Sequence, residues 1–338
     1  MKKKQKIRLY ELDALRGIAA ISVVIYHYFF RYNEIYTHEK LLVTWSHWGE
    51  FGVQLFFMIS GFVIYWTLNR VKSPMDFIVS RFSRLYPVFW GALSITFIVV
   101  ILFGLPGREV KFEHAILNLL MIHEYLRIPH VDGVYWTLTV ELTFYFAIFI
   151  FYLFKQLRYV EVWLSISVII GVFKGLGYEI PGIVSKMFIA DYMAFFIAGI
   201  CFYKIQYEEF SKLTFSVLLI SLFSSIAIFS PSMFIFFTIM YLVFYLSISS
   251  RLQFLATKPF IFLGGISYAL YLTHQNIGYI IINLFYEHGV NPLLGIATAF
   301  LISILIAYLL TKFIEKPSML FIRNAYEDIK RRKRERFA

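Results

Sequence analysis

The stretch Leu293-Leu-Gly-Ile-Ala-Thr-Ala-Phe-Leu-Ile-Ser-Ile-Leu-Ile-Ala-Tyr-Leu-Leu310 decides the fold class, because it contains no charged residue from end to end. A helix of roughly 20 apolar residues crosses a hydrocarbon core of about 30 Å. Similar tracts recur along the 338-residue chain, which is 59% hydrophobic and only 16% charged. Only helices and closed barrels satisfy the backbone inside a bilayer, and tracts of this length are helical, so we expect an all-α integral membrane protein.

Charged breaks between the apolar tracts predict about ten transmembrane helices. We place them at residues 10–30, 50–68, 86–105, 134–154, 160–178, 187–203, 213–229, 232–250, 261–284 and 293–314. Basic residues are concentrated in the connections on the side of both chain ends, so the positive-inside rule predicts cytoplasmic N- and C-termini in a multi-pass protein of the cell membrane. We expect a membrane domain over residues 1–320 and a basic cytoplasmic tail over residues 321–338.

The net charge of +11 would suggest nucleic acid binding in a soluble protein, but membrane orientation accounts for it here. We therefore expect membrane lipids as partners and no nucleic acid. The basic start is expected to lead into a retained first helix, because Asp13 and Arg16 interrupt the apolar run and no small-residue cleavage site follows. Cys201 is the only cysteine and the eight histidines are scattered, so no disulfide and no metal site are expected.

Two connections are longer than turns. Residues 69–85 are expected to form an interfacial helix with basic residues on one side. Residues 106–133 form the longest outer loop and are a candidate cover for a site. The chain has no internal repeat, which leaves transporter folds built on inverted repeats without support from the sequence.

Arg16 and His27 lie eleven residues apart on the first expected span. At about 100° per residue this spacing returns to nearly the same helix face, with roughly 16 Å between the two positions along the axis. Both side chains can therefore line one polar path. The alternative is that Arg16 extends to the inner interface and that His27 is a hydrogen-bonded interfacial histidine.

Two further expected spans carry polar residues at helical spacing. They are Thr137, Glu141 and Tyr145 on one span, and Ser267, Tyr271 and His274 on another. Packed polar seams between helices would give the same pattern. Ser60 is a candidate nucleophile for a covalent route, although Ser60-Gly61 equally fits a small-residue helix contact.

Depth along the helices links these residues. At about 1.5 Å per residue, His27, Glu141 and His274 lie at similar depth near the outer boundary, whereas Arg16, Arg81 and Arg84 lie near the inner one. Arginines at an inner opening favour a polyanionic donor such as a phosphate-bearing coenzyme. Imidazole can remove a proton from a sugar hydroxyl near neutral pH, and a carboxylate can orient it. The layout suits group transfer between compartments.

Five segments, in order along nearly the whole chain, resemble the acyltransferase 3 family of integral membrane O-acyltransferases. They are Leu12-Asp-Ala-Leu-Arg-Gly-Ile-Ala-Ala20 leading to Tyr26-His27, Phe56-Phe-Met-Ile-Ser-Gly-Phe62, Arg81-Phe-Ser-Arg-Leu-Tyr-Pro87, Trp136-Thr-Leu-Thr-Val-Glu141, and Ile266-Ser-Tyr-Ala-Leu-Tyr-Leu-Thr-His274. The spacing from Arg16 to His27 is the hallmark of that family.

The resemblance implies acyl-CoA, in the first instance acetyl-CoA, as a cytoplasmic co-substrate, no bound cofactor, and a hydroxyl of an extracytoplasmic or lipid-linked glycan as acceptor. It implies that His27 is the catalytic histidine, acting as general base or transient acyl carrier, with Glu141 in support. We assign Arg16, Arg81, Arg84 and Tyr86 to donor binding or structure, and Trp136, Thr137, Tyr145, Ser267, Tyr271, His274 and Ser60 to the lining of the acceptor site. Some members append an extracellular hydrolase-like domain, which we do not expect here.

Two other functions remain open from the sequence. In a transporter or flippase of a glycan or lipid precursor, the same polar residues would line a path without bond chemistry. In a membrane scaffold, they would be packing seams. The acyl group, the acceptor glycan and a homo-oligomeric state are also left open.

Overall fold

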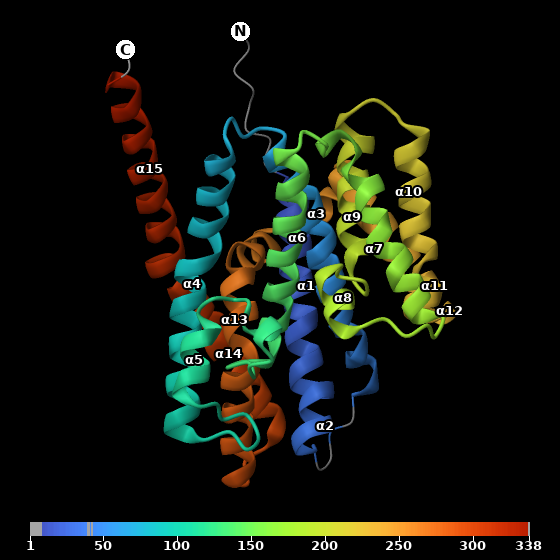
Figure 1. Cartoon of the computed structure of the whole chain (residues 1–338). Helices are drawn as coiled ribbons and strands as arrows, with labels where there is room; N and C mark the ends of the chain where they lie inside the picture. The colour runs from blue at the N-terminus through green and yellow to red at the C-terminus, as the bar shows by residue number, and fades with distance from the viewer. Residues whose placement is uncertain (1–8, 39–40, 42, 337–338) are drawn as a thin grey trace. The chain divides into compact units, whose positions relative to one another are not determined.

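In this computed structural model, residues 9–38, 41 and 43–336 are described, and every regular element among them is helical (Figure 1). The basic start at residues 1–8 and the end of the expected tail at residues 337–338 lie outside the described residues. The chain forms two compact units. The first comprises Met1–Ile21, Phe51–Trp66 and Thr143–Gly265, and the second comprises Ser22–Glu50, Thr67–Leu142 and Ile266–Ala338.

Each of the ten expected spans contains a helix, and six helical segments of the described chain are long and apolar enough to cross a membrane. These six are Tyr10–Tyr36, Thr44–Leu68, Pro74–Phe103, Gly133–Leu153, Pro231–Ile248 and Pro292–Glu335. Large apolar side chains on them are exposed, for example Leu102 at 70% and Leu301 at 66%. Exposed apolar surface on this scale is the expected exterior of a protein whose solvent is lipid.

Within the first unit, α7 (Val160–Gly175), α9 (Met193–Tyr207), α10 (Lys212–Phe223), α11 (Ser225–Ile228) and α12 (Pro231–Ile248) pack against one another. Glycines bring the backbones of α3 (Gly52–Leu68) and α9 close together. A Cβ at Gly61 would lie 2.0 Å from the Phe196 carbonyl oxygen, and one at Gly199 would lie 2.0 Å from that of Met58. Small residues at such crossings are typical of helix contacts in membranes.

A buried ion pair also lies in the first unit. Lys204 on α9 donates to Glu161 on α7 at 2.6 Å, and the other carboxylate oxygen of Glu161 accepts from Thr214 Oγ1 on α10 at 3.0 Å. Because the carboxylate is hydrogen-bonded on both oxygens, this group ties three helices together and has the character of a structural element.

In the second unit, α4 (Pro74–Phe103) is one continuous helix. We expected an interfacial helix over residues 69–85 and a separate span from residue 86. The structure instead carries the helix through Pro87, as membrane helices tolerate when neighbours satisfy the freed carbonyl. Ser73 and Asp76 form a capping box that begins the helix, with Pro74 in its first turn.

The segment expected as a basic tail continues as helix α15 (Lys316–Arg336), which packs along α4 (Figure 1). Tyr326 OH and Lys330 Nζ both donate to Asp76 Oδ1, at 2.9 and 2.7 Å. Two hydrogen bonds from α15 therefore meet at the carboxylate that caps α4, and they hold α15 beside the arginines of α4.

Two π-helical turns lie in the second unit. One, Tyr26–Arg31, separates α1 (Tyr10–Ile25) from α2 (Tyr32–Tyr36) and contains His27. The other, Thr311–Glu315, separates α14 (Pro292–Leu310) from α15 and contains Glu315. Such turns cost helix stability and are frequent at functional sites.

The connection between α4 and α6 (Trp136–Leu153) is an ordered structure that contains α5 (Phe112–Asn118) and short 3₁₀ turns. Asn118 organises it by donating to the Pro129 carbonyl at 3.0 Å and accepting from the Val131 amide at 3.1 Å. Asn276 on α13 (Lys258–Glu287) then donates to the Val131 carbonyl at 2.9 Å. The connection is thereby fixed to α13 two residues after His274.

Candidate active site

His27 and His274 contact each other although 247 residues separate them in the chain. His274 Nε2 lies 3.2 Å from His27 Nδ1, and the two ring centroids are 4.8 Å apart at an interplanar angle of 76°. Both side chains are buried. His27 Nδ1 is also 2.9 Å from the Val23 carbonyl oxygen, one turn earlier in the helix.

These contacts assign the tautomers of both rings. His274 Nδ1 lies 2.9 Å from the Tyr271 carbonyl and 3.1 Å from that of Leu270, so it must carry the proton. His274 Nε2 is then an acceptor, and His27 Nδ1 donates its proton toward both that nitrogen and the Val23 carbonyl. The lone pair of neutral His27 is consequently on Nε2, which is the form that a general base requires.

His274 is itself held in place by Tyr28. The Tyr28 hydroxyl donates to the His274 carbonyl at 2.9 Å and accepts from Ser303 Oγ at 2.8 Å. Gly278 makes room for this ring, since a Cβ there would lie 2.3 Å from Tyr28 Cε1. The glycine therefore sets how closely α13 approaches the turn that carries His27.

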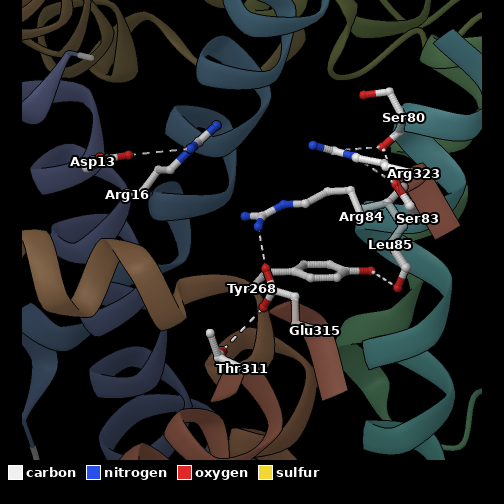
Figure 2. Close-up of polar contacts among 10 residues, drawn as sticks. All are labelled: Asp13, Arg16, Ser80, Ser83, Arg84, Leu85, Tyr268, Thr311, Glu315 and Arg323. Atoms are coloured by element: carbon white, nitrogen blue, oxygen red, sulfur yellow. Dashed lines mark hydrogen bonds and ion pairs between the residues drawn. The ribbon is translucent and has the colours of Figure 1, made fainter. Parts of the chain in front are cut away.

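A second group of polar residues forms around Arg84 on α4. Arg84 makes an ion pair with Glu315, which is only 2% exposed and lies in the π turn Thr311–Glu315 (Figure 2). Thr311 Oγ1 donates to the other carboxylate oxygen at 3.3 Å. The nearby Tyr268 hydroxyl donates to the Leu85 carbonyl at 3.4 Å, so α13 also contacts this part of α4.

Two further arginines belong to this group. Arg323 on α15 donates to Ser83 Oγ at 3.2 Å and to the Ser80 carbonyl at 3.5 Å (Figure 2). Arg81 donates to Ser80 Oγ at 3.1 Å. We call Arg81, Arg84, Arg323 and Glu315 the arginine cluster. Three guanidinium groups and one carboxylate leave it with excess positive charge and free N–H donors, which suits an anionic ligand.

Comparison with known proteins shows the family to which the chain belongs. The sequence profile of the acyltransferase domain matches residues 9–312. The chain belongs to the acyltransferase 3 family.

Named relatives share segments of this acyltransferase 3 chain. Acyltransferase MdmB of Streptomyces mycarofaciens is 29% identical over 43% of this chain and 40% of its own length. Exopolysaccharide production protein ExoZ of Rhizobium meliloti is 30% identical over 29% of this chain and 32% of its own. Peptidoglycan O-acetyltransferase OatA of Listeria monocytogenes is 29% identical over 28% of this chain and 13% of its own. Each match spans less than half of the relative, and no solved structure matches.

In this acyltransferase 3 chain, the hydroxyl of Thr137 on α6 contacts the hydroxyl of Tyr271 on α13. Tyr271 precedes His274 by three residues on the same helix. Thr137 Oγ1 lies 3.0 Å from Tyr271 OH, and both hydroxyls lie near the Val134 carbonyl, at 3.0 and 3.3 Å. Ser267 is buried on α13. Trp136 and Glu141 lie on α6 and are partly exposed. The contact that orients His27 comes from His274, and the supporting role of Glu141 stays a prediction.

The remaining predicted residues have local partners. In the first unit, Arg16 pairs with Asp13 at 3.7 Å (Figure 2), and Ser60 Oγ lies 3.5 Å from Tyr145 OH. In the second unit, Tyr86 OH donates to the Leu120 carbonyl at 3.3 Å. Tyr86 therefore anchors the α4–α6 connection, and its assignment to donor binding stays a prediction.

Sequence reasoning missed Asp132, a fully buried carboxyl that caps the 3₁₀ turn Gly133–Tyr135 leading into α6. Its two oxygens accept from the Val134 amide at 3.2 Å and the Asn276 amide at 3.1 Å. Burial raises the pKa of Asp132 to about 7, against the lowering effect of these two hydrogen bonds and of Arg108. Asp132 therefore links the turn before α6 to α13 at Asn276, two residues after His274.

This carboxyl predicts a pH dependence of stability. An unfolded aspartate loses its proton near pH 4, whereas folded Asp132 keeps it up to about pH 7, so the free energy of unfolding should fall as pH rises between these values. In detergent, we expect the wild-type melting temperature to fall by at least about 3 °C more than that of Asp132→Asn between pH 5 and pH 7.5. Equal slopes for the two proteins would contradict the assignment.

Proposed function

We propose that this acyltransferase moves an acyl group, most simply acetyl, from cytoplasmic acyl-CoA to a hydroxyl of an extracytoplasmic or lipid-linked glycan. The observation that carries the proposal is the His27–His274 contact, which leaves a lone pair on His27 Nε2. A buried imidazole with a fixed tautomer is the group needed to activate a hydroxyl near neutral pH.

The reaction follows from that tautomer. His27 Nε2 removes the acceptor hydroxyl proton as the hydroxyl oxygen attacks the thioester carbonyl, so that a C–O bond forms and the C–S bond breaks. The imidazolium is stabilised through Nδ1–H by the Val23 carbonyl and His274 Nε2. It then returns the proton to the thiolate of the departing coenzyme. A transient acyl group on His27 is the covalent alternative, and Glu141 is proposed to support either route.

The arginine cluster supports the choice of donor. Coenzyme A carries several phosphate charges, and Arg81, Arg84 and Arg323 provide guanidinium groups that bind phosphate oxygens in pairs. The Ser80 and Ser83 hydroxyls already hold two of these side chains in position. We propose that the donor phosphates bind at the arginine cluster, and the assignment of Arg16 to donor binding or structure stays a prediction.

The names of two relatives support the choice of a glycan as acceptor. One is named a peptidoglycan O-acetyltransferase and another an exopolysaccharide production protein. We propose a polysaccharide or glycolipid acceptor for this chain too. The proposal includes ten spans in the cell membrane with cytoplasmic termini, for which the six long apolar helices and the basic connections are the support.

The test is thioester cleavage by the purified protein in detergent. With acetyl-CoA and a mixture of methyl glycosides of glucose, galactose and N-acetylglucosamine, we expect wild type to release free coenzyme A, detected by a thiol reagent, at a rate that rises with saccharide concentration. Uptake of labelled saccharide into proteoliposomes without any thiol release would instead identify a transporter and refute the proposal.

A further inference from the structure

Two buried amide side chains directly follow His274. Gln275 is 3% exposed and Asn276 is 1% exposed, and within the described part of the chain Gln275 Oε1 and Asn276 Oδ1 accept no hydrogen bond. A buried acceptor left in this state costs about 1–3 kcal/mol, and folded proteins keep few of them. Each oxygen therefore needs an O–H or N–H donor from outside the chain.

Gly133, the first residue of the 3₁₀ turn Gly133–Tyr135 that leads into α6, is surrounded by polar atoms. A Cβ on Gly133 would lie 2.6 Å from Gln275 Oε1, 2.9 Å from Arg108 Nη1 and 3.2 Å from Gln275 Nε2. Arg108 interacts with the Tyr36 side chain and forms no ion pair with the described carboxylates. An unpartnered amide oxygen and a guanidinium with spare donors thus converge where the glycine has no side chain.

This group adjoins the histidine pair. Gln275 Nε2 donates to the Tyr279 hydroxyl at 3.4 Å, and the Tyr279 ring centroid lies 6.5 Å from that of His27. Neighbouring polar groups already have partners, because Asn276 Nδ2 donates to the Val131 carbonyl and Asp132 accepts two amides. In this group, the oxygens of Gln275 and Asn276 are the acceptors that the protein's own donors do not satisfy.

We infer that Gln275, Asn276 and Arg108 form the subsite for the acceptor, and that it recognises a molecule with several neighbouring hydroxyls. Two hydroxyl protons of a saccharide would donate to Gln275 Oε1 and Asn276 Oδ1, and a saccharide oxygen would accept from Arg108. An alcohol with one hydroxyl places that hydroxyl at His27 Nε2 and leaves these three groups unsatisfied. The inference rests on the proposed function, since it assigns the molecule that His27 deprotonates.

The test compares methyl β-glucoside with ethanol as acceptors of acetyl from acetyl-CoA. Gln275→Met keeps the side-chain length but removes the amide. We expect it to raise the KM for the glucoside about tenfold, equivalent to one lost hydrogen bond of roughly 1.4 kcal/mol, without changing the KM for acetyl-CoA or the rate with ethanol. Because the variant removes an unsatisfied buried group, its melting temperature without acceptor should equal or exceed that of wild type.

A second variant, Gly133→Ala, places a methyl group among the same atoms. These atoms are the ends of flexible side chains, so the fold should persist while Gln275 and Arg108 are displaced. We expect a rise of about tenfold in the KM for the glucoside. Gly182→Ala is the matched control, because Gly182 also occupies the first position of a helix but a Cβ there meets nothing within 4 Å.

The outcomes separate the two proposals. Normal thioester cleavage with an unchanged KM for the glucoside in both variants would overturn the subsite alone. Equal losses with glucoside and ethanol, together with a lower melting temperature, would give Gln275 a structural role and would also overturn it. If the wild-type protein released no coenzyme A, the proposed function itself would be refuted.

Discussion

Replacing His27 by alanine should lower the rate of acetyl transfer by about 10³-fold, the range expected when a general base is removed. His27 is the residue whose Nε2 lone pair is left available by the contacts of Nδ1 with Val23 and His274. The rate of coenzyme release with saturating saccharide is the measurement, made on protein matched for abundance in the membrane.

The control for this experiment is His288→Ala. His288 is an exposed histidine beyond the end of α13 whose Nδ1 contacts the Leu284 carbonyl. Its loss should leave activity and melting temperature unchanged within error. An active His27→Ala protein, or a His288→Ala protein with the same defect, would refute the role given to His27.

Replacing Arg84 by alanine should destabilise the protein by about 2–3 kcal/mol, because Glu315 would remain as an unpaired buried carboxylate. Breaking a fully buried pair costs about 3–5 kcal/mol, and the 32% exposure of the Arg84 side chain reduces that figure. The measurement is the melting temperature in detergent, with chemical unfolding to obtain the free energy.

A double variant separates stability from donor binding. Arg84→Met with Glu315→Gln removes both charges and should regain most of the lost stability, but its KM for acetyl-CoA should be higher than that of wild type because a phosphate-binding guanidinium is gone. Arg331→Ala is the matched control on α15, since Arg331 is 69% exposed and pairs with an exposed aspartate. If Arg84→Ala melts like wild type, the Arg84–Glu315 pair does not support the fold as argued.

Much of the fold could be predicted because membrane helices are specified by long apolar runs, which a single sequence displays. The failures lie where tertiary contacts override local signals. We expected a boundary between residues 85 and 86, yet α4 continues across it and through Pro87. The expectation of a basic tail over residues 321–338 did not include the contacts of Tyr326 and Lys330 with Asp76, which hold this segment against α4. Arg323 was missed for that reason.

The similar depth of His27 and His274 could be predicted from the sequence, but the contact between them could not. Counting residues placed His27 and His274 at similar depth, because rise per residue is constant. Their mutual contact depends on helix rotation and on the π turn Tyr26–Arg31, neither of which has a pattern in one sequence. Gln275 and Asn276 gave no signal either, because an amide beside a histidine in an apolar helix is uninformative until its partners are known.

The central claim is that His27 activates a saccharide hydroxyl for acyl transfer. The most direct test is mass spectrometry of methyl β-glucoside after incubation with acetyl-CoA and purified protein. We predict an O-acetylated glucoside with wild type and none above background with His27→Ala of equal melting temperature. Formation of the same ester at the wild-type rate by His27→Ala would contradict the account.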